Sequence, residues 1–355
     1  MAKKLLIPAV VLLFITGCST SPELHLLTGE AQGTTYTIKY TGDSVISPQM
    51  VDSVLESMDI EMNSWRTDSR ISAINSFDRT DTVYAFYDNS KIWSVLWDMS
   101  WEINQQSYGA FDPTVMPLVE LWGFGLSNIQ KVDSAKVDSV MSFIGFRTDL
   151  IDLDEVENDT AYIESHIIKG DPRSQLDFNA IAQGYTVDML YDLLIENGAK
   201  NSMIELGGEV RCTGVNERGE LWKIAVDKPV ASGHNNREFQ AIIPVKDASI
   251  CTSGNYRKFV EVAGVKRSHS IDPRSGYPVE HNLLSVTIKA TEASIADAYA
   301  TACMVLGPEE GRFFIEEQIS SAPQYNIEAL FIMGSEEGYE FWVSPGWEDV
   351  VTLLD

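Results

Sequence analysis

The fold is decided around the stretch Leu176-Asp-Phe-Asn-Ala-Ile-Ala-Gln-Gly-Tyr-Thr-Val-Asp188, which leads from an extended segment into a helix over 181–197. Small and apolar residues three and four apart predict the face that this helix buries. These residues are Ala180, Gly184, Val187, Tyr191 and Leu194. Asn197-Gly198 predicts the end of the helix, because glycine accepts the left-handed conformation that closes a last turn.

Short β-rich runs dominate after this helix, and one more helix interrupts them. The last helix is expected from Ala293 to Leu306, ended by Gly307-Pro308. Because strands and helices are grouped unevenly, the chain is predicted to be α+β and not a doubly wound sheet. The predicted strands are Met203–Leu206, Trp222–Val226, Ala241–Val245, Ser249–Ser253, Leu284–Ile288, Ala329–Met333 and Tyr339–Val343.

The part before residue 176 predicts a strand, two helices and an unusual loop. Residues 33–40 alternate like a strand, and helical spacing marks 51–62 and 92–103. Residues 107–125 are apolar although prolines and glycines break them, so we expect this loop to be packed down and to line a site. Residues 126–160 are more polar and predict a short helix and a hairpin.

The first residues resemble a lipoprotein signal peptide, expected over residues 1–17. Lys3 and Lys4 precede an apolar run that is too short to span a bilayer, and Ile15-Thr16-Gly17-Cys18 resembles the bacterial lipobox. Cys18 is then the acylated residue, residues 18–27 are a tether, and two acyl chains anchor the protein to the cell envelope. Ser19, which is not aspartate, favours the outer membrane facing the periplasm, with the inner membrane as the alternative. A plain secretory signal or a short membrane anchor are the other interpretations.

Composition limits the partners. Lys and Arg number 26 against 52 Asp and Glu, so the formal net charge is −26. This charge argues against nucleic acid and anionic lipid surfaces as ligands, and a phosphate ligand would need a bound cation and local N–H donors. Apart from Cys18, three cysteines remain and no CxxC occurs, so a zinc–thiolate site is unsupported and at least one thiol is free.

The clearest chemical signal lies in the last helix. Asp297 and Thr301 stand four residues apart among alanines, so both oxygens project from one helical face. A carboxylate beside a hydroxyl suits Mg²⁺, with water and a substrate phosphate completing the coordination. The alternative is an aspartate that accepts a hydrogen bond from the threonine within a helix pair.

Two weaker candidates accompany this pair. Asp177 lies at the entrance of the 181–197 helix, where free N–H groups suit a phosphate, although an ordinary helix cap explains it equally. His269 lies in a polar, turn-rich segment and is a candidate general base; the alternative is a histidine bonded to backbone in a turn. The common nucleotide and hydrolase motifs are absent.

Taken together, these segments resemble the ApbE family of flavin transferases in order and spacing from about residue 28 to 345. The matching stretches are Gly33-Thr34-Thr35, Ser64-Trp65 with Asp68-Ser69, Gly109–Val115, Leu121–Gly125, Asp177–Tyr185, Gly207-Gly208-Glu209, Thr252-Ser-Gly254, Ser268-His269, Ile271-Asp-Pro273 with Gly276-Tyr-Pro278, and Ala296-Asp297 with Ala300-Thr301.

The resemblance implies one domain over residues 28–350, with T-fold-like mixed sheets and packed helices. It implies that Asp297, Thr301 and the carbonyl of Ala180 bind Mg²⁺. Two positions that contact FAD in the family differ here, with Gln32 in place of methionine and Gln183 in place of lysine. The other residues implied to line the FAD pocket are Trp65, Ala110, Phe111, Asp112, Asp177 and Ile271.

The activity implied is transfer of FMN from FAD to a Thr or Ser hydroxyl of an acceptor flavoprotein in a membrane redox complex, with release of AMP. His269 is then the general base. Water as acceptor would make the protein a Mg²⁺-dependent FAD pyrophosphatase. A non-catalytic lipoprotein that binds flavin or a glycan is the remaining alternative, in view of the eight tryptophans.

Overall fold

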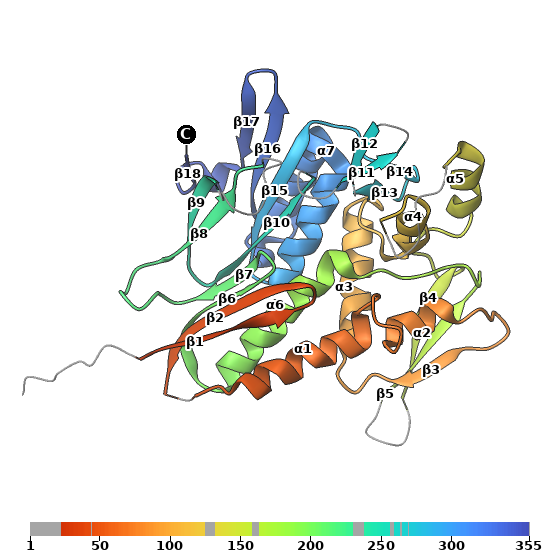
Figure 1. Ribbon diagram of the computed structural model, residues 1–355, viewed down its shortest axis with the longest axis horizontal. Coiled ribbons are helices and arrows are strands. Elements are labelled where there is room, and N and C mark those ends of the chain that lie inside the picture. Colours follow the sequence, from red (N-terminus) through yellow and green to blue (C-terminus); the bar gives the residue numbers. More distant parts are fainter. Residues whose placement is uncertain are drawn as a thin grey trace, which may run out of the picture.

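The centre of the protein is an eight-stranded antiparallel sheet (Figure 1). The computed structural model describes residues 23–43, 45–124, 132–157, 163–229, 238–255, 259–262, 265–268 and 270–354. From one edge to the other, the sheet consists of β1 (Leu24–Ala31), β2 (Thr34–Gly42), β6 (Ala199–Leu206), β7 (Glu209–Thr213), β10 (Ala248–Gly254), β15 (Leu283–Ala290), β16 (Glu328–Ser335) and β17 (Gly338–Val343).

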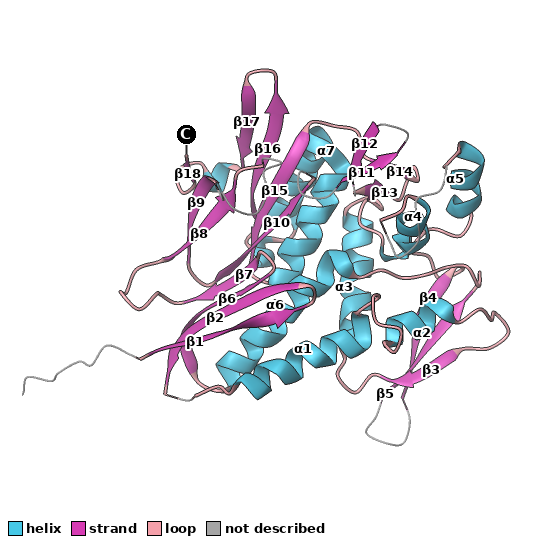
Figure 2. Cartoon of the chain, in the orientation of Figure 1, coloured by secondary structure: helices cyan, strands magenta, loops and turns pink. Residues whose placement is uncertain are grey.

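The long helices are α1 (Pro48–Met62), α3 (Ile92–Gln106), α6 (Asn179–Glu196) and α7 (Ala293–Ser321). Two of them, α6 and α7, pack against this sheet, and α1 and α3 pack against those two helices (Figure 2). Inside α7, Gly307 has φ 82° and Pro308 follows, so two helical sections meet at a kink. The predicted end at Gly307-Pro308 is confirmed as a break in the helical backbone, and a second helical section that was not predicted follows it, because proline is well tolerated in the first turn of a helix.

Smaller elements surround this framework. The short helices are α2 (Arg70–Ser76), α4 (Met116–Leu121), α5 (Ser134–Met141), η1 (Pro113–Val115), η2 (Pro323–Tyr325) and η3 (Pro345–Trp347). Two three-stranded sheets, in spatial order, are β3 (Tyr84–Tyr87) with β5 (Ile163–Lys169) and β4 (Ile151–Glu157), and β18 (Thr352–Leu353) with β9 (Phe239–Val245) and β8 (Trp222–Asp227). Two hairpins pair β11 (Phe259–Val262) with β12 (Val265–Ser268), and β13 (Ile271–Asp272) with β14 (Tyr277–Pro278).

The central sheet is buried on both faces at β10 and β16, where side chains of one strand join two different cores. In β16, Phe331 and Met333 face the helices, whereas Leu330 and Ile332 pack with Trp222 of β8 in a second core. Successive side chains of a strand point to opposite faces, so one apolar run serves two cores. This explains the near-continuous apolar character of the β-rich runs.

The α+β prediction is confirmed, and most predicted elements are present with shifted bounds. The predicted strand over 33–40 corresponds to β2, with Tyr36, Ile38 and Tyr40 buried as expected. The tether boundary is corrected, because β1 already begins at Leu24 and pairs with β2. Backbone pairing with β2 outweighs the weak local signal of this segment.

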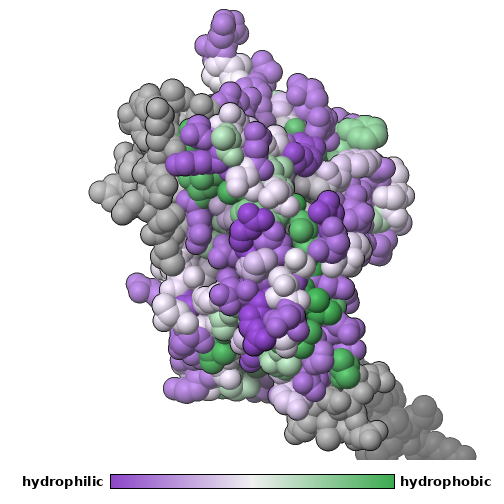
Figure 3. Space-filling view, turned by 90° about the vertical axis from the view of Figure 1, so that its right-hand side faces the viewer, coloured by the Kyte–Doolittle hydropathy of each residue, from purple (hydrophilic) through white to green (hydrophobic). Residues whose placement is uncertain are grey.

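The surface of the described residues has a mixed character. Figure 3 shows hydrophobic residues scattered among hydrophilic ones on the face that it draws. No helix among the described residues is both long enough and apolar enough to cross a membrane. The cysteines of the central framework, Cys212, Cys251 and Cys303, are free and buried.

Candidate functional site

A pocket of about 780 Å³ lies between α1, the 110–119 segment, the start of α6, strands β7 and β10, and the middle of α7. This volume is typical of pockets that hold small ligands and cofactors. His269 lies outside the described residues, whereas its neighbours Ser270 and Ile271 line the pocket. Cys18, the predicted lipidation residue, also lies outside the described residues. The structure brings together the predicted pocket and metal residues that it describes: Gln32, Trp65, Ala110, Phe111, Asp112, Asp177, Ala180, Gln183, Ile271, Asp297 and Thr301.

The deepest part of the pocket is built where α6 and α7 cross at Gly184. A Cβ atom at this residue would lie 2.4 Å from the carbonyl oxygen of Ala293, so no larger residue fits. The N–H of Gly184 donates to Oδ2 of Asp297 at 3.1 Å. In an α-helix the same N–H pairs with the carbonyl four residues earlier, which is that of Ala180. The crossing therefore brings the Asp297 carboxylate toward a carbonyl that also lines the pocket.

Asp297 is a buried carboxylate at this crossing. Its exposed fraction is 6%. Burial raises its pKa well above the usual value, nearby Glu209 and Asp188 raise it further, and the bond from Gly184 opposes this shift. A cation bound beside the carboxylate would favour its charged form.

The donor set fits Mg²⁺. Among the described residues, no three His, Cys, Asp or Glu side chains are close enough to hold a metal by themselves. The pocket instead offers a carboxylate, a hydroxyl and a backbone carbonyl from Asp297, Thr301 and Ala180. These are hard oxygen donors, and Mg²⁺ is commonly bound by one or two carboxylates with water and substrate phosphate.

Thr301 lies one turn after Asp297 and has a partner from the sheet. Its hydroxyl is 3.2 Å from that of Ser253, at the pocket end of β10. Asp297 thus bonds to Gly184 and Thr301 to Ser253, rather than to each other as the alternative interpretation required. Ser253 lies in the matching stretch Thr252-Ser-Gly254, but the sequence analysis assigned it no role of its own.

Asp177 lies just before the N-cap residue of α6, Phe178, and lines the pocket. Its Oδ1 accepts the N–H of Asn179 at 2.8 Å, and its own N–H donates to the carbonyl of Pro113 at 2.7 Å. Burial raises the pKa of this carboxyl. Trp65 and Phe124 lie beside it around a small side chamber of about 50 Å³.

The carboxylate of Asp112 organises the loop that closes the other side. Its Oδ1 accepts from the N–H and hydroxyl of Thr114, at 2.7 and 2.6 Å, and its Oδ2 accepts from the N–H of Phe146 at 3.1 Å. Burial raises its pKa, and these hydrogen bonds oppose that shift. Because both oxygens already bind the protein, Asp112 shapes the pocket through the loop that it caps.

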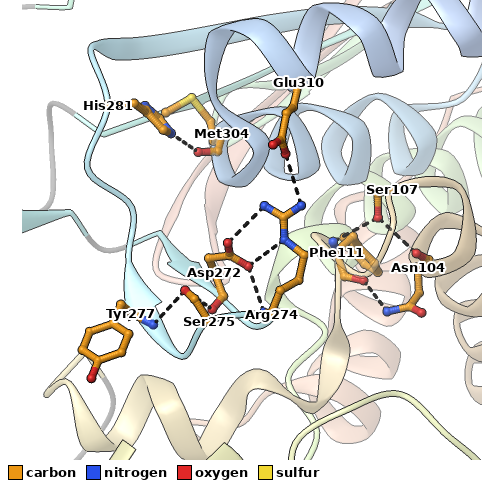
Figure 4. A network of polar contacts seen from close by, with 10 residues as sticks. All are labelled: Asn104, Ser107, Phe111, Asp272, Arg274, Ser275, Tyr277, His281, Met304 and Glu310. Atoms are coloured by element: carbon orange, nitrogen blue, oxygen red, sulfur yellow. Dashed lines mark hydrogen bonds and ion pairs between the residues drawn. The ribbon is translucent and has the colours of Figure 1, made fainter. Parts of the chain in front are cut away.

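Two residues of α3 and its end hold the neighbouring Phe111 (Figure 4). Asn104 donates its Nδ2 to the Phe111 carbonyl at 2.8 Å, and the Ser107 hydroxyl accepts the Phe111 N–H at 3.0 Å. Tyr108 and Gly109 both have positive φ, so the chain turns sharply at these two residues, just before the pocket-lining Ala110 and Phe111. These contacts were missed by the sequence analysis, since they join side chains to backbone.

Arg274 ties the β13–β14 hairpin to α7 beyond the kink (Figure 4). Its guanidinium donates to both oxygens of Asp272, at 2.9 and 3.0 Å, and to Glu310 at 3.3 Å. This hairpin also carries Ile271, which lines the pocket. Asp272 and Glu310 hold the pKa of Arg274 above its ordinary value.

His281 binds α7 just before its kink. Its Nε2 donates to the carbonyl of Met304 at 3.0 Å, and its Nδ1 accepts the N–H of Leu283 at 3.3 Å (Figure 4). A carbonyl only accepts, so these contacts select the neutral tautomer with the proton on Nε2. Burial lowers the pKa of His281, which favours the same neutral form.

Gln32 and Gln183, the two departures from the family pattern, both line the pocket. Gln32 lies in the tight β1–β2 turn with φ 50°, and its amide donates to the hydroxyl of Thr186 at 2.9 Å. The Gln183 amide lies beside Gly207, as does the carboxylate of Glu209. Glu209 is buried and lines the pocket, although the sequence analysis gave it no role. A carboxylate directly after a diglycine was the signal that could have identified it.

The pocket is of cofactor size and contains a buried set of oxygens, so the protein belongs to the class of ligand-binding α+β proteins. Similarity to known proteins identifies its family. The chain belongs to the ApbE family, whose sequence profile matches residues 32–325.

Curated relatives match over nearly the whole length. The FAD:protein FMN transferase of Vibrio cholerae is 32% identical over 348 residues, which cover 97% of each chain. The FAD:protein FMN transferase of Haemophilus influenzae is 28% identical, over 94% of this chain and 93% of that protein.

Solved structures confirm the fold. The flavin transferase ApbE from Vibrio cholerae superposes with a TM-score of 0.76 at 30% identity, over 93% of this chain and 99% of that one. The apo form of the flavinyl transferase ApbE from Pseudomonas stutzeri gives a TM-score of 0.76 at 27% identity, over 94% and 98%.

Proposed function

We propose that the protein is an FAD:protein FMN transferase that uses Mg²⁺. It moves the FMN part of FAD onto a Thr or Ser hydroxyl of an acceptor flavoprotein and releases AMP. The observation that carries this proposal is the oxygen set of Ala180, Asp297 and Thr301, which lines a pocket of about 780 Å³. Membership of the ApbE family and the printed activity of its relatives support it.

The chain's own residues divide the work of the reaction. Ala180, Asp297 and Thr301 would hold Mg²⁺, which would supply positive charge against the diphosphate that an acidic protein otherwise repels. The apolar side chains of Phe111 and Ile271 line the same pocket and exclude water from it.

His269 is the proposed base. Its imidazole takes the proton of the acceptor hydroxyl as the hydroxyl oxygen bonds to the phosphorus on the riboflavin side. The bond from this phosphorus to the bridging oxygen breaks, and that oxygen leaves with AMP. The pocket-lining position of Ser270 supports this assignment, because it places the chain next to His269 at the site.

The direct test is a transfer assay. Full-length protein, FAD, Mg²⁺ and a candidate acceptor flavoprotein subunit are incubated, and the acceptor mass is measured after denaturation. We expect a covalent FMN adduct on the acceptor. His269→Ala should still bind FAD but should transfer about 10²- to 10⁴-fold more slowly, which is the usual contribution of a general base. A normal rate in this variant contradicts its role.

The same assay separates the alternatives. Free FMN and AMP without any adduct would identify a Mg²⁺-dependent FAD pyrophosphatase. Failure to bind FAD would leave a non-catalytic lipoprotein, and binding without turnover would leave a flavin carrier.

Lipid anchoring through Cys18 is part of the proposal and rests on the lipobox-like sequence. The protein would then face the periplasm from the outer membrane, or from the inner membrane, within reach of a flavoprotein subunit of a membrane redox complex. Cys18→Ala should move the protein from the membrane fraction to the soluble fraction of a cell lysate. Unchanged fractionation contradicts acylation at this residue.

A further inference from the structure

Asp188 joins α6 to the start of α7. Its Oδ1 accepts the N–H of Ala293 at 2.8 Å, and its Oδ2 accepts the N–H and the hydroxyl of Ser294 at 2.9 and 2.7 Å. The N-cap residue of α7, Glu292, makes no capping bond with its side chain. The free donors of the first turn of α7 are therefore satisfied by a carboxylate from another helix.

Asp188 is also fixed by a cation from the sheet. Nη1 of Arg211, on β7, donates to its Oδ1 at 2.5 Å. The guanidinium of Arg211 lies 3.7 Å from the centre of the Tyr191 ring on α6. Asp188 is 7% exposed, so this is a buried ion pair. Removal of either partner would leave a buried charge without compensation. Thus α6, α7 and β7, each of which contributes to the pocket, meet at one side chain.

The contacts between α6 and α7 recur at intervals of one helical turn. Asp188 meets the first turn of α7, Gly184 meets Asp297, and Ala180 lines the pocket with Thr301. Positions 188, 184 and 180 are four apart, as are 293, 297 and 301. The contact of Asp188 with the first turn of α7 therefore fixes the position of α7 along its axis relative to α6, and with it the positions of Asp297 and Thr301 in the pocket.

The required precision is high. A shift of α7 by one residue would move Asp297 by about 1.5 Å along the axis and turn it by about 100°. Mg²⁺ demands oxygen distances of about 2.0–2.1 Å and near-octahedral geometry, so such a shift would remove a ligand.

We propose that Asp188 is a positioning residue, which sets the register of α7 against α6 and so holds Ala180, Asp297 and Thr301 at the spacing that a divalent cation needs. The inference rests on the proposed function, because these oxygens form a metal site only if the protein binds Mg²⁺.

The test measures metal binding directly, with Mn²⁺ as a paramagnetic probe and full-length protein at a temperature where circular dichroism shows each variant folded. Asp188→Asn keeps the shape but replaces one acceptor oxygen with an amide NH2 group, which only donates. We expect its dissociation constant for Mn²⁺ to rise about 10- to 100-fold, the usual effect of losing a group that orients a metal ligand. The matched control is Asp192→Asn, the same change one turn further along α6 at an exposed position, and it should stay within about twofold.

A milder variant keeps the test decisive if Asp188→Asn does not fold. Ser294→Ala removes only the hydroxyl donor to Asp188 and should weaken Mn²⁺ binding about two- to fivefold, within the effect of one lost hydrogen bond. An unchanged dissociation constant in a folded Asp188→Asn, or in Ser294→Ala if the former does not fold, overturns the inference. Absence of Mn²⁺ and Mg²⁺ binding in the unmodified protein instead refutes the proposed metal site.

Discussion

The two sides of the pocket are built in different ways. The helix wall, which consists of Ala180, Asp297 and Thr301, is held by the close crossing of α6 and α7 at Gly184. The loop wall, which consists of Trp65, Ala110, Phe111, Asp112 and Ile271, is held by side chains that bind loop backbone. Trp65 at its rim is 59% exposed, whereas Asp297 is 6% exposed.

This difference shows that the helix wall controls the charge of the pocket, whereas the loop wall controls its shape. The helix wall places hard oxygens in a buried position, and its geometry depends on backbone contact that cannot relax. The loop wall supplies apolar surface, and a change at its rim leaves the framework intact. We therefore expect variants of the helix wall to affect metal binding or folding, and variants of the loop wall to affect mainly substrate affinity.

The largest effect is expected at Asp297. Metal catalysis contributes several kcal/mol of transition-state stabilisation, so Asp297→Ala should slow flavin transfer by about 10³-fold. EDTA should slow the unmodified protein equally and should add little to the variant. Glu316→Ala, at an exposed position of the same helix, is the control and should be nearly normal. If the activity of Asp297→Ala depends on Mg²⁺ concentration as in the unmodified protein, Asp297 is not a ligand of Mg²⁺ and the assignment is contradicted.

The next effect concerns the crossing that holds the helix wall. A methyl group at Gly184 meets the Ala293 carbonyl, so Gly184→Ala should destabilise the protein by about 3 kcal/mol. Urea unfolding measures this change. Gly334→Ala is the control, because a Cβ there lies 3.5 Å from its nearest neighbour, an ordinary contact. Equal stability of the two variants would show that α6 and α7 lie further apart at Gly184 than in the structure.

A third effect concerns a buried lysine at the end of β5. Lys169 is 1% exposed and its Nζ lies 3.5 Å from the carbonyl of Asn75, whose side chain binds both backbone groups of Leu176. Burial lowers the pKa of Lys169 to about 8. The charge therefore costs stability at all pH values below about 8, and the cost is relieved as pH rises from there towards the unfolded value of about 10.4.

Removal of this charge should consequently stabilise the protein. We expect Lys169→Met to raise the free energy of unfolding by about 2 kcal/mol at pH 7, with a gain that shrinks by pH 9.5. Urea unfolding at the two pH values measures it, with exposed Lys200→Met as the control. A gain that grows with pH would have the wrong sign for a lysine whose pKa is lowered.

The smallest effect is expected at the rim. Trp65→Ala should raise the KM for FAD about fivefold, equivalent to about 1 kcal/mol, with kcat and the free energy of unfolding nearly unchanged. Phe313→Ala provides a matched control, since Phe313 is 62% exposed and does not line the pocket. A loss of kcat in Trp65→Ala would mean that the loop wall also positions the reacting groups.

Local patterns were sufficient for much of the fold and for part of the site. Alternation predicted β2 and the central strands, and helical spacing predicted α1, α3, α6 and the first section of α7. The spacing of Asp297 and Thr301 alone placed two oxygens on one face, because a helix repeats every 3.6 residues. Family resemblance then supplied the remaining predicted residues, and the structure gathers those that it describes around one pocket.

Other features depended on contacts between distant segments. The Gly307-Pro308 pair carries the same local signal whether a helix ends or kinks, and only packing after it decides between them. Asp112 lines the pocket as expected, and folding also brings its oxygens to Thr114 and Phe146. Asn104 and Arg274 gave no signal, and Ser253 stood in a matching stretch without a role of its own, because their partners are backbone groups or side chains brought close only by folding.

The sequence by itself determined the elements, the acidic charge and the pair of oxygens on the last helix, since all of these follow from composition and short-range periodicity. Only the tertiary structure decided that Gly184 meets Asp297 and that Asp188 meets Ser294, across more than a hundred residues. The physical reason is that hydrogen-bond partners across a helix crossing are chosen by how closely two backbones approach, and no local pattern encodes that distance.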